Sequence, residues 1–201
     1  MIKNQSLILD ENKSQKITKK INDNFLIVLN DLNDKNVNKT IHLDFAKNST
    51  CKIYCIIVNF NNIKQYIFNL NQDLNSHVDI KVKIFGFKNS YTKVLINSNI
   101  PKNAQKIYLN QEINGYLFSD DATILATPSM NISNNKIVAN HSVNVGSINP
   151  EKLFYLMSRG IAKKAAINLL IESEYQYLKK LNISNAEYYY KKVDNKISKN
   201  I

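Results

Sequence analysis

Short apolar runs separated by polar turns fill the chain from residue 5 to about residue 140, and this pattern constrains the fold more than any other feature. The clearest run is residues 78–84, in which Val and Ile alternate with Asp and Lys, so an extended strand there would bury one face. Runs of this kind follow one another at a spacing of roughly 8 to 14 residues, which is typical of all-β proteins. The sequence therefore predicts a mainly β fold over this region.

The turns between these runs contain few of the usual turn formers, since the chain has only 4 Gly and 3 Pro. Asn and Asp must make most of the turns, because both tolerate left-handed backbone angles and hydrogen-bond within a turn. Asn-rich corners between short strands suit a β-helix, in which each coil stacks on the next. A β-sandwich fits the same strand pattern, and no fixed-period repeat separates the two folds.

The character of the sequence changes near residue 149. Asn149 is a good helix N-cap, Pro150 suits the first helical position and Gly160 is a natural helix terminator, so a short helix is expected through EKLFYLMS. The chain is therefore predicted to have two regions. Residues 1–148 form the β-helix core, and residues 149–201 form a helical region.

Two more helices are expected after the first. One runs from about residue 162 to residue 181, where small and aromatic residues recur at three- and four-residue spacings. The other begins at Ser184, whose capping box with Glu187 marks a helix start. Three consecutive tyrosines, residues 188–190, spread over most of a helix circumference and cannot form one flat stacking platform for nucleic acid.

The formal net charge of +11 raises the question of nucleic-acid or membrane binding. The basic residues are almost all Lys, scattered among Asn and Ile, and the chain has a single Arg, Arg159. Phosphate-binding proteins usually keep several Arg for bidentate contacts. We therefore expect neither nucleic acid nor a membrane as a partner, and a basic nucleic-acid-binding β-protein is the weakest functional hypothesis.

Cys51 and Cys55 are the only cysteines, and they form neither a CxxC pair nor part of a larger ligand cluster. We expect both to be small core residues on the same face of one strand. No nucleotide-binding loop, nucleophile elbow or HExxH motif occurs either, so we do not expect an enzyme. There is no apolar run of about eighteen residues and no signal-peptide core, which favours the cytoplasm, or a plastid-type organelle if a transit peptide has been removed.

Residues 140–161, NHSVNVGSINPEKLFYLMSRGI, resemble the C-terminal signature of the SufB/SufD family, in which a strand carrying a His is followed by a V-G pair and an LFYL-x-SRGI helix. The matching residues are His141, Val145, Gly146, Ile148, Glu151, Leu153, Phe154, Tyr155, Leu156, Ser158, Arg159, Gly160 and Ile161. The resemblance continues less closely from about residue 75 to about residue 181. It implies a right-handed β-helix with C-terminal α-helices, in a chain shorter than most family members.

The resemblance is closer to SufD than to SufB. SufB-like proteins carry a Cys in the strand before the signature, whereas residues 121–132, DATILATPSMNI, contain none. The chain departs from the family at residues 142–144, where Ser-Val-Asn replaces the usual Gly-Ala-Thr. The likeness implies a SufD-like, non-catalytic scaffold of the SUF iron–sulfur cluster assembly complex. Such a scaffold pairs with a SufB-like subunit and docks the SufC ABC ATPase through residues 149–201.

His141 is the histidine of the signature, and its imidazole is the predicted metal ligand. The resemblance implies that a partner subunit supplies thiolates to a shared site, so the iron–sulfur cluster is transient and this chain alone holds none stably. A hydrogen-bonded structural His at the mouth of the β-helix is the alternative. The predicted partner-binding residues are Phe154, Tyr155, Arg159 and Gly160, with a local helix cap as the other role for Arg159. Because Phe154 and Tyr155 are adjacent, we expect one of them in the core and the other free for contact.

A second hypothesis is a self-sufficient homo-oligomeric scaffold, in which copies of this chain replace both SufB and SufD. The absence of a Cys near the signature argues against it, because iron–sulfur clusters need thiolate ligands.

Overall fold

The computed structural model describes residues 16–21, 24–31, 34–147 and 150–180, together with residues 191 and 195. The chain divides into two compact units, Met1–Gly146 and Ser147–Ile201. The sequence placed the boundary after residue 148.

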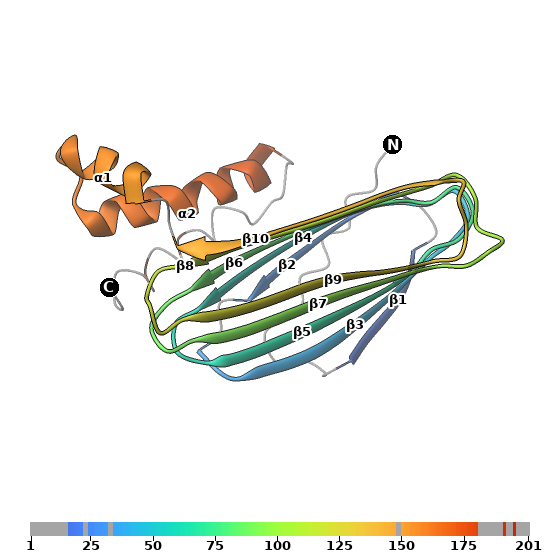
Figure 1. Ribbon diagram of the computed structural model, residues 1–201, viewed down its shortest axis with the longest axis horizontal. Helices are drawn as coiled ribbons and strands as arrows, with labels where there is room; N and C mark the ends of the chain where they lie inside the picture. The colour runs from blue at the N-terminus through green and yellow to red at the C-terminus, as the bar shows by residue number, and fades with distance from the viewer. Residues whose placement is uncertain are drawn as a thin grey trace. The chain divides into compact units, whose positions relative to one another are not determined.

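The first unit consists of parallel strands that alternate between two sheets. The strands are β1 (Lys16–Ile21), β2 (Asn24–Asp31), β3 (Val37–Phe45), β4 (Thr50–Asn59), β5 (Ile63–Asn71), β6 (His77–Gly86), β7 (Tyr91–Ile100), β8 (Ile107–Leu117), β9 (Thr123–Ile132) and β10 (Ile137–Ser147). One sheet has the order β1-β3-β5-β7-β9, and the other has the order β10-β8-β6-β4-β2 (Figure 1).

Each strand therefore pairs with the strand two places earlier in the chain, which makes a parallel β-helix of about four turns. The prediction of a β-helix is confirmed, and the sandwich is excluded. The coils lengthen along the chain, since Lys16 lies opposite Thr40 whereas Tyr91 lies opposite Thr123. This change in coil length explains why the sequence shows no fixed-period repeat.

The interior of the β-helix is built from inward-facing aliphatic and aromatic residues. In β6 the predicted alternation is confirmed, because Val78, Ile80, Val82 and Ile84 are all fully buried. Cys51 and Cys55 are free thiols buried in the same core. Burial raises the pKa of the Cys55 thiol, which therefore stays protonated at neutral pH and behaves as a small apolar side chain.

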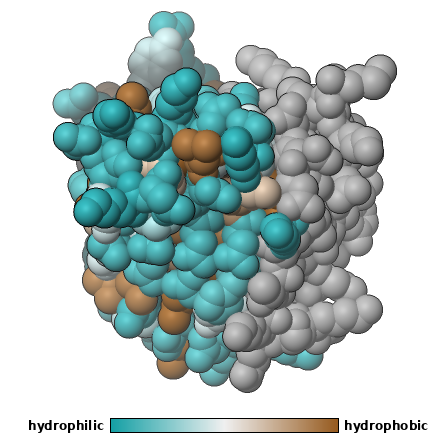
Figure 2. All heavy atoms as spheres, turned by 90° about the vertical axis from the view of Figure 1, so that its right-hand side faces the viewer, coloured by the Kyte–Doolittle hydropathy of each residue, from teal (hydrophilic) through white to brown (hydrophobic). Residues whose placement is uncertain are grey.

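Asn side chains form the corners and tie successive coils together. Asn48 and Asn75 hold left-handed backbone angles, with φ of 64° and 56°, as expected for Asn-rich turns. Asn75 Nδ2 donates to Asn48 Oδ1 at 2.8 Å, so the two corners are stacked. Lys88 and Lys106 also have positive φ, which the sequence did not predict. Figure 2 faces the corners at one end of the strands, and most of the side chains described there are hydrophilic.

Hydrogen-bonded ladders of Asn and Asp side chains run along the outside of the sheet that contains β3, β5, β7 and β9. Each rung joins residues that lie opposite each other in neighbouring strands. The rungs are Asn71 to Asp44 at 2.7 Å, Asn97 to Asn69 at 3.1 Å and Asn131 to Asn99 at 3.1 Å. Such ladders stabilise a particular register, because a slip by one residue would turn these side chains to the other face.

At the opposite corners, aromatic rings stack from coil to coil. The ring centroids of Phe60 and Phe87 are 4.7 Å apart, and those of Phe87 and Phe118 are 4.4 Å apart. Each contact joins residues from successive coils. The stacked rings therefore stabilise the stacking of the apolar corners, as the Asn pairs stabilise the stacking of the polar ones.

A buried ion pair lies between β2 and β5. Lys64 is fully buried, and its Nζ lies 3.2 Å from Asp31 Oδ1 and donates to the Val58 carbonyl at 3.0 Å. The Tyr66 hydroxyl donates to Asp31 Oδ2. Burial and the negative charge of Asp31 together raise the pKa of Tyr66. Charged groups at this depth are stable only while they remain paired and hydrogen-bonded.

The second unit contains α1 (Pro150–Ser158) and α2 (Lys163–Lys180), which contact each other. As predicted, the first helix begins at Pro150 and stops at Gly160, whose φ is 82°. The Ile161 amide donates to the Leu156 carbonyl at 3.2 Å and the Gly160 amide donates to the Met157 carbonyl at 2.9 Å, which is the Schellman pattern. The expected N-cap at residue 149 lies outside the described residues.

The second predicted helix is confirmed by α2. The third, expected from Ser184, falls almost wholly outside the described residues, as do the three tyrosines of residues 188–190. Among the helices that the structure describes, none is long and apolar enough to cross a membrane.

Candidate functional site

The last coil of the β-helix is open. β9 and β10 are the outermost strands of their sheets at this end, so no further strand pairs with them in the described part of the chain. Thr92 and Val94 of β7 are fully buried, whereas Ile124 and Ala126, which lie opposite them in β9, are only partly buried. The inward face of the last coil is thus more accessible than the same face one coil earlier.

His141 lies on this inward face. In β10, Ile137 and Ala139 pack against the core, and side chains two apart in a strand point to the same side. Val145 lies further along the same face. A Cβ added to the buried Gly115 of β8 would lie 3.2 Å from Val145 Cγ2, so the two residues are neighbours. His141 falls between these residues, and it is exposed. The imidazole is therefore accessible at the mouth of the β-helix.

The free edges of β9 and β10 differ in their capacity to pair with another strand. The amides of Thr123 and Ser133 donate to carbonyls of the β7 coil. The backbone N–H groups of odd-numbered residues in β9 therefore point toward β7, and those of even-numbered residues point to the free edge. Pro128 takes one of the edge positions and has no N–H to donate there. β10 contains no proline over its 11 residues. Of the two edges, β10 offers the uninterrupted row of backbone groups.

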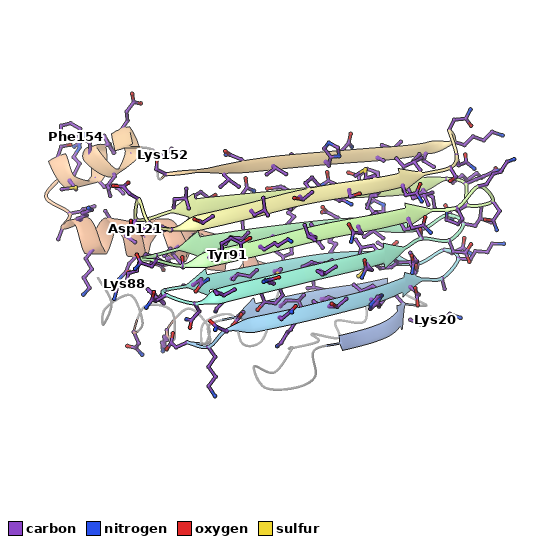
Figure 3. All side chains as sticks on the ribbon, turned by 60° about the horizontal axis from the view of Figure 1, so that its bottom comes forward. Lys20, Lys88, Tyr91, Asp121, Lys152 and Phe154 are labelled. Carbon is purple, nitrogen blue, oxygen red and sulfur yellow. The ribbon has the colours of Figure 1, made fainter. Side chains whose placement is uncertain are left out.

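A second group of exposed residues lies on α1. Phe154 is 73% exposed and Tyr155 is 57% exposed, and Figure 3 shows Phe154 projecting from the helix. The expectation that one of them belongs to the core is therefore wrong. The partly buried positions are Leu153 and Leu156, which lie three residues apart and so share the inner side of the helix.

Arg159 extends this exposed surface. Its guanidinium carbon lies 5.4 Å from the centre of the Tyr155 ring, one helical turn earlier, which is a cation–π contact. The sequence hypotheses for Arg159 were a cap or a partner contact, and neither included this ring. Phe154, Tyr155, Met157 and Arg159 together are called the α1 surface below. Gly160 gives the surface its sharp end, because its left-handed backbone closes the helix.

The predicted site residues thus fall into two groups. His141 belongs to the first unit, and Phe154, Tyr155, Arg159 and Gly160 belong to the second. Within the described residues, no three His, Cys, Asp or Glu side chains gather closely enough to hold a metal ion. One imidazole supplies one ligand, and an iron–sulfur cluster needs several, mostly thiolates.

The other two histidines lie on strands of earlier coils. His77 is exposed, and its ring packs on Tyr108 of the next coil with centroids 4.1 Å apart. His42 is partly buried on β3. Neither lies in the last coil beside His141.

The fold is thus a parallel β-helix that ends in an accessible histidine and is followed in the chain by a pair of helices. Residues 89–174 match the family model described as "SUF system FeS cluster assembly, SufBD core domain", and this range contains every predicted site residue. Over these residues the chain is similar to the SufB/SufD family, whose core domain is described as part of iron–sulfur cluster assembly.

Two curated relatives resemble the chain over part of its length. It is 38% identical over 72 residues to the iron–sulfur cluster assembly protein SufD of Bacillus subtilis, a match that covers 36% of this chain and 16% of that protein. It is 28% identical over 79 residues to an iron–sulfur cluster assembly SufBD family protein of Archaeoglobus fulgidus, covering 39% of this chain and 21% of the relative. The matches therefore span about a fifth or less of these relatives.

Proposed function

We propose that this chain is a SufD-like scaffold of the SUF iron–sulfur cluster assembly complex, which pairs with a SufB-like subunit and docks the SufC ATPase. The observation that carries the proposal is the exposed His141 on the inward face of the open last coil. One coil earlier the same face is closed by packing, since Thr92, Val94 and Ile96 of β7 are fully buried. A single accessible ligand at an open end is what a site shared with a second subunit requires.

The free edge of β10 supports pairing with another β-helix. An exposed strand edge with its N–H and C=O groups available can add a strand from a partner. Pro128 weakens the same contact at β9, so the partner is expected to enter from the β10 side. His141 lies on β10 itself, and a paired strand would carry the partner's thiolates close to the imidazole.

The α1 surface supports docking of the ATPase. Aromatic side chains, Met and Arg are the residues most enriched at protein interfaces, and four of them are exposed here over less than two helical turns. Stacking on Tyr155 holds the Arg159 guanidinium in place, which lowers the entropy lost on binding.

In this proposal the chain has no catalytic residue, and the cluster is cargo that is held briefly and passed on. ATP-driven dimerisation of SufC would shift the populations of two arrangements of the paired scaffolds and so open or close the shared site. We place this activity in the cytoplasm, or in a plastid-type organelle. Neither nucleic acid nor a membrane takes part.

Truncation of both exposed aromatics, Phe154→Ala with Tyr155→Ala, is expected to weaken binding of the SufC-type ATPase by about tenfold or more, since each interface anchor contributes about 1 to 2 kcal/mol. Isothermal titration of the purified ATPase into the full chain measures this change. Ile63→Ala is the matched control, because Ile63 is a 50% exposed apolar residue on β5, which belongs to the other unit of the chain. Equal affinity for the double variant and the control would refute docking through this surface.

A further inference from the structure

Gln111 is a polar residue in the interior of the β-helix. It lies on the inward face of β8, between Leu109 and Ile113, and is fully buried. Its Nε2 donates to Ser98 Oγ at 2.7 Å and to the Ser129 carbonyl at 3.4 Å, so the side chain reaches across the core to the other sheet. Its Oε1 is buried and has no hydrogen-bond partner. An orphaned carbonyl of this kind costs about 1 to 3 kcal/mol.

The orientation of this amide is fixed by its surroundings. The Ser129 carbonyl can only accept a hydrogen bond, so the group that faces it must be the NH₂ and not the oxygen. Both hydrogens of Nε2 are then used, and Oε1 is left as the acceptor. A buried Leu or Met would fill the same space without this penalty.

Gln111 lies level with His141 of the next coil. Val145 Cγ2 is in contact range of Gly115, and four residues back along each of these parallel strands are His141 and Gln111. Neighbouring strands are about 4.8 Å apart, which brings an inward Gln and an inward His within reach of each other. The two side chains form no hydrogen bond in the structure. His141 is exposed, so its ring has room to take another rotamer.

The other neighbours of Gln111 on this face cannot donate to it. Ile80 lies opposite it in β6, and Leu109 and Ile113 flank it along its own strand. All three are apolar. A ring N–H of His141 is therefore the donor that the inward face supplies next to Oε1.

The geometry assigns Gln111 as a positioning residue for His141: its Oε1 accepts the proton of one ring nitrogen and thereby leaves the lone pair of the other nitrogen directed out of the β-helix mouth. This inference rests on the proposed function in that the outward nitrogen is the one offered to the cluster. Ligating histidines generally have their second nitrogen held in this way, which fixes the tautomer and the ring orientation.

Long-range proton–nitrogen correlation of the ¹⁵N-labelled full chain tests the assignment, because it reports which ring nitrogen carries the proton. At about pH 8, where an ordinary imidazole is neutral, His141 is expected to show a single tautomer, identified by its loss in His141→Asn. Gln111→Met keeps the volume and removes the acceptor, so both tautomers should appear. Gln65→Met, a change at a partly buried Gln of β5, is the control and should leave the His141 pattern unchanged.

Two results would overturn the assignment. They are a mixture of tautomers in the wild-type chain, or a single tautomer that persists in Gln111→Met. If Gln111→Met does not fold, Ser98→Ala removes one of the two anchors of the amide and should reduce the tautomer preference, and an unchanged preference would count equally against the assignment. Failure of the proposed function is seen separately, as normal cluster assembly by His141→Ala, and it leaves the tautomer result intact.

Discussion

Asp31→Asn is expected to lower the free energy of unfolding by about 3 to 5 kcal/mol, because it removes the counter-charge that lies 3.2 Å from the fully buried Lys64 ammonium. The Tyr66 hydroxyl also loses its carboxylate acceptor. The ion pair joins β2 to β5, so the substitution should destabilise the first coils of the β-helix. Urea denaturation of the full chain at neutral pH measures the change.

Two variants make this result specific. Replacing both partners with apolar residues, Asp31→Leu with Lys64→Met, is expected to cost far less than Asp31→Asn alone, since no unpaired charge remains buried. Glu112→Gln weakens the partly exposed contacts to Lys81 and Lys83, at 3.3 and 3.4 Å, and should cost less than about 1 kcal/mol. A cost for Asp31→Asn no larger than that of Glu112→Gln would show that Asp31 is not what keeps the Lys64 charge in the core.

His141→Ala is expected to reduce the initial rate of cluster formation by about tenfold or more in a complex reconstituted with SufB-like and SufC-like subunits, because loss of a ligand costs at least as much as loss of the residue that orients it. The free energy of unfolding should change by less than about 0.5 kcal/mol, since the side chain is exposed. The growth of visible absorbance as the cluster forms measures the rate.

His77→Ala is the matched control for this experiment. His77 is also an exposed histidine on a strand of the same β-helix, and its ring packs on Tyr108 instead of facing an open end. The variant should assemble clusters at the wild-type rate. Equal rates for the two variants would remove His141 from the site.

The strands could be predicted because alternation of apolar and polar residues is a local property. In β6 the pattern fixes both the strand and its buried face. The pairing of strands is not local, and coils of unequal length hide it from any search for a period. The buried pair of Asp31 and Lys64 could not be predicted either, since hydropathy places a lone Lys at the surface and the two residues meet only through coil stacking.

The site was predicted in part. The signature located His141 and the helix that ends at Gly160, because helix caps and sequence motifs depend on residues that are close together in the chain. Exposure of both Phe154 and Tyr155 was missed, since adjacency in a helix shows only that two residues differ in direction and not which direction is buried. Gln111 carried a usable signal: it occupies an inward position between Leu109 and Ile113, where an apolar residue is expected.

The central claim is that this chain works as one of several different subunits. Affinity isolation of the tagged full chain from its own cells, with the mass and composition of the native complex determined by mass spectrometry, tests it most directly. The account predicts an assembly that contains an ABC ATPase and a distinct, cysteine-bearing SufB-like scaffold. An assembly made only of copies of this chain, with or without the ATPase, would contradict it and favour the homo-oligomeric scaffold.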